Sequence, residues 1–124
     1  MVKKLLPFLF IIFHLHFFSQ SVSQNTAKTC AEYFLSTEIN ENVSLTLEKT
    51  IYVEVNNQQT PAFYIFNNSQ TNKFVIISAN KLVLPILSYS SSSHFIYDTL
   101  SMPIATQLML TRYTENIEEI VLRN

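Results

Sequence analysis

The sequence contains no glycine and no tryptophan, and it contains one cysteine, Cys30. Without glycine the chain cannot form the glycine-rich loop that holds phosphate groups, or the G-x-S-x-G turn that exposes a nucleophilic serine. A single cysteine excludes an internal disulfide, although many small exported domains depend on several. These absences argue against P-loop proteins, hydrolases with a nucleophile elbow, and small disulfide-stabilised scaffolds.

The turns of the chain must also be made without glycine. Asparagine tolerates the left-handed backbone conformation better than most residues do. Two polar stretches, residues 56–61 and 67–72, are predicted to be turns. In the second stretch we expect Asn67, Asn68 and Asn72 to take the positions that glycine would otherwise occupy.

Charged and metal-binding residues are few. The formal net charge is −1 and no basic stripe is present, so nucleic acid is not an expected partner. His94 is the only histidine after residue 23, and its distance from Cys30 along the sequence does not fit metal-ligand spacing. We therefore predict no metal and no cofactor.

The same two residues are the only candidates for a thiol–imidazole catalytic pair. We expect Cys30 to be buried on the apolar face of a helix, and His94, which follows four serines, to lie in an exposed loop. Glu115, Glu118 and Glu119 are interpreted as a solvated helix face. The sequence therefore predicts a protein that is not an enzyme.

The first 23 residues have the pattern of a secretory signal peptide. A short basic start precedes an apolar segment from Leu5, and small and polar residues follow it. The apolar segment is shorter than the roughly 20 residues that a membrane-spanning helix needs. Because Ser21-Val22-Ser23 fits the small-x-small rule, we predict cleavage after Ser23. An uncleaved N-terminal anchor is the alternative.

Cleavage at that position would leave residues 24–124 as one exported domain, periplasmic or extracellular and without membrane association. The lack of disulfides fits a bacterial exported protein better than a small eukaryotic disulfide scaffold. Hydrophobic periodicity predicts a helix over residues 26–36, capped by Asn25 or Thr26. Its expected apolar face consists of Ala27, Cys30, Ala31, Phe34 and Leu35.

A second helix is predicted from Pro103, which suits a first helical position, to about Leu122. Its expected inner face consists of Ala105, Leu108, Met109, Arg112, Tyr113, Asn116, Ile117 and Ile120.

The region between the helices has the patterns of β-strands. Residues 43–48 and 51–55 alternate between apolar and polar side chains, whereas residues 62–66 and 74–77 are continuously apolar. The run of residues 62–66 predicts a strand that is covered on both faces. Residues 82–87 contain Pro85, which predicts an edge strand, a bulge or part of a loop. Strands in one block with a helix at each end indicate an α+β fold with a small antiparallel sheet of three to five strands.

Several short motifs follow one another in an informative order. The sequence reads AFYIFN, a polar turn, KFVIISAN, and then LPILSYS before a closing aromatic residue. This order resembles the pro-region of streptopain-type cysteine peptidases and the related free-standing Spi inhibitors. The matching residues in this part are Tyr64, Phe66, Asn67, Phe74, Val75, Ile76, Ile77, Ser78, Leu84, Pro85, Ile86, Leu87, Tyr89, Ser90 and Phe95. The two helices match through Ala31, Phe34, Leu35, Pro103, Tyr113 and Ile117. Lys73, Ala79 and Asn80 depart from the pattern, where the family has its turn glycines and an aspartate.

The resemblance implies a secreted inhibitor of a streptopain-like cysteine peptidase that occludes the active site without a covalent bond. The inhibitory contact would come from the segment before the second helix: Tyr97, Asp98, Thr99, Leu100, Ser101, Met102 and Pro103. In the peptidase zymogens an asparagine near the position of Ser101 helps to disturb the catalytic arrangement, and this chain has none there. Because no catalytic domain follows Asn124, we expect a free-standing inhibitor or a separately made pro-region. The alternatives are a folding helper that acts on a separate peptidase, and a generic extracellular binding module.

Overall fold

The computed structural model describes residues 20–124. Its elements are α1 (Gln24–Ile39), β1 (Thr46–Val55), β2 (Gln58–Asn68), β3 (Lys73–Ser78), β4 (Ile86–Ser90) and α2 (Ile104–Arg123). The strands form one antiparallel sheet in the order β1-β2-β3-β4. The α+β class and the terminal helices are therefore confirmed. Most of the predicted signal peptide, residues 1–19, lies outside the described residues, and within residues 20–124 no helix is long and apolar enough to span a membrane.

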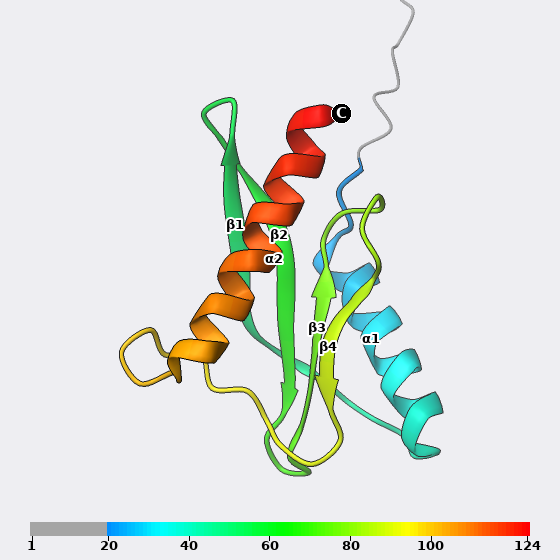
Figure 1. The fold of residues 1–124 in the computed structure, drawn as a ribbon. Coiled ribbons are helices and arrows are strands. Elements are labelled where there is room, and N and C mark those ends of the chain that lie inside the picture. The colour runs from blue at the N-terminus through cyan, green and yellow to red at the C-terminus, as the bar shows by residue number, and fades with distance from the viewer. Residues whose placement is uncertain (1–19) are drawn as a thin grey trace, which may run out of the picture.

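The two helices cover opposite faces of the sheet (Figure 1). The reason lies in β2, where residues 62–66 are all buried. Successive side chains of a strand point to opposite faces. Tyr64 and Phe66 therefore pack with α1, and Phe63 and Ile65 pack with α2. This confirms the prediction that residues 62–66 form a strand covered on both faces.

The first helix begins earlier than predicted and buries a narrower face. Ser23 is the N-cap, and its Oγ accepts a hydrogen bond from the Thr26 backbone N at 3.2 Å. Only three residues of α1 are fully buried, at i, i+4 and i+8: Ala27, Ala31 and Leu35. The prediction that Cys30 is buried is wrong, because its side chain is exposed. Neighbouring residues of an α-helix point in different directions. The side chain of Cys30, one residue before Ala31, therefore lies off the face that Ala31 buries.

Asparagine does replace glycine, but not at all of the expected positions. Asn40, Asn56, Asn57 and Asn72 have positive φ angles, so only Asn72 was predicted correctly. Asn56 and Asn57 form a two-residue hairpin turn, since positive φ at both central residues is the type I′ geometry. The predicted longer turn over residues 56–61 is therefore wrong, because β2 already begins at Gln58.

Asn67 and Asn68 are the last two residues of β2 and not turn residues. The second predicted turn is correspondingly shorter, because it starts only after Asn68. Pro85 lies just before β4, which is an edge strand. The Pro85 carbonyl accepts a hydrogen bond from the Ser78 N at 2.8 Å.

The two alternating patterns of residues 43–48 and 51–55 belong to a single strand, β1, which begins only at Thr46. Its register shifts between Leu47 and Lys49 and again between Ile51 and Tyr52. Val53 and Val55, which follow the second shift, are buried in the cluster that α2 covers.

The inner face of the second helix agrees with the prediction in part. Leu110 and Ile117 are its buried residues. Three further residues pack against the same cluster: Met109, Tyr113 and Val121. Leu108, which was placed on the inner face, is 59% exposed. Met109, Tyr113 and Ile117 therefore lie on the predicted inner face, whereas the buried Leu110 was not included in it.

Tyr64 offers a test of how the α1-side core responds to alkaline pH. Its burial, and the nearby Tyr52, raise the pKa of the Tyr64 phenol above the ordinary value of 10.0. Folding thus favours the neutral phenol, so this stabilisation is complete below pH 10 and is lost as the pH rises through the folded-state pKa. In urea unfolding between pH 7 and pH 11, Tyr64→Phe should flatten the alkaline loss of stability. Tyr33→Phe, which removes a phenol that is 75% exposed, should leave the slope unchanged. Equal slopes for all three chains would contradict the assignment.

Candidate functional site

The seven predicted contact residues lie in one connection between β4 and α2. We call residues 97–103 the contact loop. In Figure 1 it leaves the sheet near the start of α2 and projects beyond the β1 edge. Both ends of the loop are fixed to the domain, and its middle is exposed.

The first fixed point is Phe95, just before the loop. Its backbone N donates to the Asn67 Oδ1 at 2.7 Å, and its carbonyl accepts from the Asn67 Nδ2. Asn67 is buried, so its amide replaces the backbone partner that a neighbouring strand would supply. The Phe95 ring packs edge-on against Phe74, with ring centroids 5.3 Å apart. Phe95 therefore holds the entry to the contact loop in the protein core.

Glu48 extends this anchor from β1. Its Oε2 accepts from the Asn67 Nδ2 at 3.3 Å, and its Oε1 accepts from the Tyr97 backbone N at 3.3 Å. The next residue, Lys49, places its Nζ 5.2 Å from the centroid of the Tyr97 ring, a cation–π distance. One carboxylate thus connects the core asparagine to the first residue of the contact loop.

The middle of the loop is a compact turn organised by Asp98. Its Oδ1 accepts from the Leu100 N at 3.0 Å, and its Oδ2 accepts from the Ser101 Oγ at 2.6 Å. Its carbonyl oxygen accepts from the Ser101 N at 3.2 Å and from the Met102 N at 2.9 Å. One residue therefore bonds to the three residues that close the turn.

The exit from the loop is fixed through Met102 and the start of α2. The Met102 side chain packs against the cluster that α2 covers, and its carbonyl accepts from the Gln107 Nε2 at 2.9 Å. Pro103 is the N-cap of α2, and its carbonyl accepts from the Gln107 N at 3.1 Å. The prediction that Pro103 opens this helix is therefore confirmed to within one residue.

Between these anchors, Leu100 is left without protein contacts of comparable extent. It is 95% exposed, the highest value among the large hydrophobic residues of the described chain. Thr99 and Ser101 on either side are also exposed. The arrangement presents one apolar side chain at the tip of a turn whose backbone is already held. Such a tip is suited to enter an apolar pocket on another protein.

The pKa of the Asp98 carboxyl reports directly on the hydrogen bonds that organise this turn. The hydrogen bonds from the Ser101 hydroxyl and then from the Leu100 N favour the ionised form and hold the pKa of Asp98 below its ordinary value of 3.8. The bonds are therefore at full strength above pH 3.8 and weaken as the pH falls through the lowered pKa. Asp98 is the only aspartate in the sequence, so its carboxyl signal in an NMR titration is easily assigned.

We expect Ser101→Ala to move the measured pKa of Asp98 upward, toward 3.8, because the strongest donor is removed. Thr99→Ala is the matched control, since no hydrogen bond joins the Thr99 side chain to Asp98. A pKa that is the same in the unchanged chain and in Ser101→Ala would show that the turn is not organised in this way.

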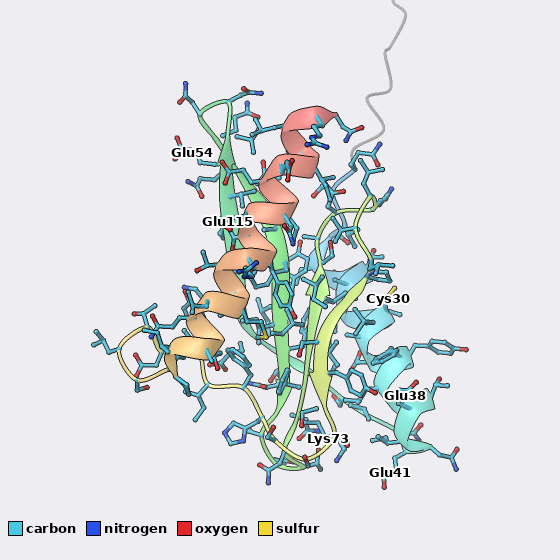
Figure 2. All side chains as sticks on the ribbon, viewed as in Figure 1. Cys30, Glu38, Glu41, Glu54, Lys73 and Glu115 are labelled. Carbon is cyan, nitrogen blue, oxygen red and sulfur yellow. The ribbon has the colours of Figure 1, made fainter. Side chains whose placement is uncertain are left out.

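The residues considered for catalysis and metal binding lie elsewhere. Cys30 is on α1, on the side of the molecule away from the contact loop (Figure 2). His94 is exposed, as predicted, and its Nδ1 lies 3.1 Å from the Asn72 Oδ1. Glu115 and Glu119 are exposed, and Glu119 forms an ion pair with Arg123. Within residues 20–124 no three side chains of the histidine, cysteine, aspartate or glutamate type are grouped to hold a metal ion.

Sequence reasoning missed the two residues that fix the loop, Asn67 and Glu48. Asn67 was interpreted as a turn residue and Glu48 as the polar position of a strand. The signal for Asn67 was its place at the end of a fully apolar strand, where a buried amide needs partners. Glu48 gave no comparable signal, because its partner Tyr97 is remote in the sequence.

Residues 19–117 match the family described as Spi protease inhibitor. Neither the curated proteins nor the solved structures gave a match. The matched residues include all of the sheet, α1, the contact loop and most of α2. Because the match spans most of the 124 residues, the chain belongs to the Spi protease inhibitor family.

Proposed function

We propose that this protein is an exported inhibitor of a streptopain-like cysteine peptidase and that the contact loop occludes the active-site cleft without forming a covalent bond. The family implies a protease as partner and a role other than catalysis. The choice of a streptopain-like enzyme rests on the ordered motifs of residues 64–90, which resemble the pro-region of those peptidases.

The observation that carries the proposal is the contact loop itself, which is held at both ends and exposes Leu100 at its tip. Ordering a flexible loop on binding costs conformational entropy, and a loop that is already ordered avoids much of that cost. Burying a leucine side chain in a partner contributes about 1.5–3 kcal/mol. The loop thus combines a low ordering cost with one strong apolar contact.

In this proposal the sheet and helices serve as the scaffold, and the loop provides the blocking element. Entry of the turn into the cleft excludes the substrate by volume, so no bond to the catalytic cysteine is needed. The tip alone is too small for a stable complex, since specific interfaces bury on the order of 1,600 Å² in total. We therefore expect surfaces beside the loop to contact the peptidase as well.

The direct test is titration of the protein against a streptopain-type cysteine peptidase. We expect inhibition at micromolar concentration or below, with full recovery of activity on dilution. Occlusion should also protect the catalytic cysteine from alkylation by iodoacetamide. Since Cys30 is exposed and would itself react, a Cys30→Ser chain should be used. No inhibition at micromolar concentration would exclude the proposal.

The resemblance to a pro-region favours one second candidate, a folding helper for a separately made peptidase. This function predicts a higher yield of active enzyme when the peptidase is refolded in the presence of the domain. An inhibitor without helper activity would leave the yield after its removal unchanged. The two functions are therefore separated by measuring refolding yield and equilibrium inhibition on the same preparation.

A further inference from the structure

The four residues before α1 form part of the fold. Ser21 makes an isolated antiparallel bridge with Asn80. The Val22 N donates to the Ala79 carbonyl at 2.7 Å, and the Lys81 N donates to the Gln20 carbonyl at 2.8 Å. Residues 20–22 therefore pair with the chain that continues from β3, in the manner of a short additional strand.

Val22 and Ser23 contribute most to this segment. The Val22 side chain packs against the α1-side core, and its carbonyl accepts from the hydroxyl of Tyr64 at 2.8 Å. Tyr64 is buried, so this carbonyl satisfies a phenol that would otherwise lack a partner in the core. Ser23 caps α1. A domain that began at Gln24 would lose the cap, the Tyr64 acceptor and the Val22 side chain together.

The small-x-small rule fits two positions in this region. Ser21-Val22-Ser23 allows cleavage after Ser23, and Ser19-Gln20-Ser21 allows cleavage after Ser21. The second position keeps both Val22 and Ser23 in the mature chain and removes only the Ser21–Asn80 bridge and the Gln20 carbonyl that accepts from the Lys81 N. Both positions therefore fit the rule, but they leave different folded products.

We propose that a signal peptidase hydrolyses the Ser21–Val22 bond, so that the mature protein begins at Val22. Water adds across this peptide bond: Ser21 leaves with the leader as a carboxylate, and the Val22 nitrogen becomes an ammonium group. The ammonium still has N–H groups to donate to the Ala79 carbonyl, and a charged donor forms the stronger hydrogen bond. Because residues 20–22 pair with residues 79–81 in the folded protein, the bond must be cut before that pairing forms. The proposal does not depend on the inhibitory function.

The test is expression of the full chain in an exporting bacterium, followed by intact mass and N-terminal sequencing of the exported protein. We expect Val22 as the first residue. A first residue of Gln24 or Gln20, or a retained leader, would overturn the proposal.

Two substitutions separate the cleavage positions. Ser19→Phe places a large residue at the third position before the Ser21–Val22 bond and should abolish the product that begins at Val22, so that only uncleaved chain or a product that begins at Gln24 is found. It should not affect cleavage after Ser23, whose corresponding residue is Ser21. Ser23→Asp prevents cleavage after residue 23 but keeps a good N-cap, and this chain should still begin at Val22. A Ser19→Phe product that still begins at Val22, or failure of Ser23→Asp to be processed, would contradict the proposal.

A stability measurement tests whether Val22 and Ser23 stabilise the folded domain. Chains that begin at Val22 and at Gln24 should differ in melting temperature by roughly 10 °C, because a domain of this size shifts by several degrees for each lost cap or unpaired buried group. Equal melting temperatures would show that Val22 and Ser23 do not contribute to the folded domain.

Discussion

Replacement of Leu100 by alanine is expected to raise the inhibition constant against the target peptidase by roughly ten- to hundredfold. Leu100 is 95% exposed in the free protein, so its truncation removes no internal contact of consequence, and the melting temperature should stay within about 1 °C. The lost affinity corresponds to the apolar area that the leucine would bury in the cleft, since each 1.4 kcal/mol is a factor of about ten. Steady-state inhibition assays and thermal unfolding of the same preparation check both parts.

Leu84→Ala is the matched control for this substitution. Leu84 is also a highly exposed leucine, at 80%, but it lies in the connection before β4 and lines a groove beside the C-terminal half of α2. We expect its inhibition constant to change by less than about threefold. Equal losses for Leu84→Ala and Leu100→Ala would assign the contact to general apolar surface and not to the loop tip.

Replacement of Asn67 by alanine should produce the largest loss of stability, about 2–4 kcal/mol. The substitution leaves the N–H and carbonyl of Phe95 without their partners, and each buried unpaired group costs about 1–3 kcal/mol. The entry to the contact loop then loses its fixed position. We expect the inhibition constant to rise at least tenfold even at temperatures where the protein remains folded. Urea unfolding gives the change in the free energy of unfolding, and inhibition assays at 15 °C give the change in the inhibition constant.

Asn42→Ala controls for removal of an asparagine in general. Asn42 is exposed in the connection between α1 and β1, so its replacement should change the free energy of unfolding by less than about 0.5 kcal/mol. If Asn67→Ala destabilised the protein but left inhibition unchanged, the anchoring of the loop would not matter for binding.

The elements that the sequence predicts well are those fixed by local pattern. Residues 62–66 are apolar at every position, and only a strand covered on both faces accommodates such a run in an antiparallel sheet flanked by helices. Pro103 and Pro85 were informative because proline lacks an N–H and its consequences are local. Cys30 was misplaced because a one-residue step decides whether a helical side chain faces the core.

The two residues that fix the contact loop, Asn67 and Glu48, could not be predicted from local sequence pattern, for a different reason. The bonds from Asn67 to Phe95 and from Glu48 to Tyr97 join residues that are distant in the sequence, and no periodicity specifies a contact between a strand side chain and a remote backbone. The resemblance assigned the contact role to the segment before α2, but it could not show how that segment is held. The signal peptide and the identity of the peptidase remain predictions.

The left-handed asparagines have a consequence for the unfolded chain. Glycine gives an unfolded polypeptide its greatest freedom, and each glycine replaced at a position that tolerates the replacement reduces the entropy lost on folding. Asn40, Asn56, Asn57 and Asn72 accept some strain in the folded protein. In return, the denatured ensemble of a chain without any glycine is narrower than that of an ordinary sequence of its length. Part of this small domain's stability therefore originates in the lower conformational entropy of its unfolded state.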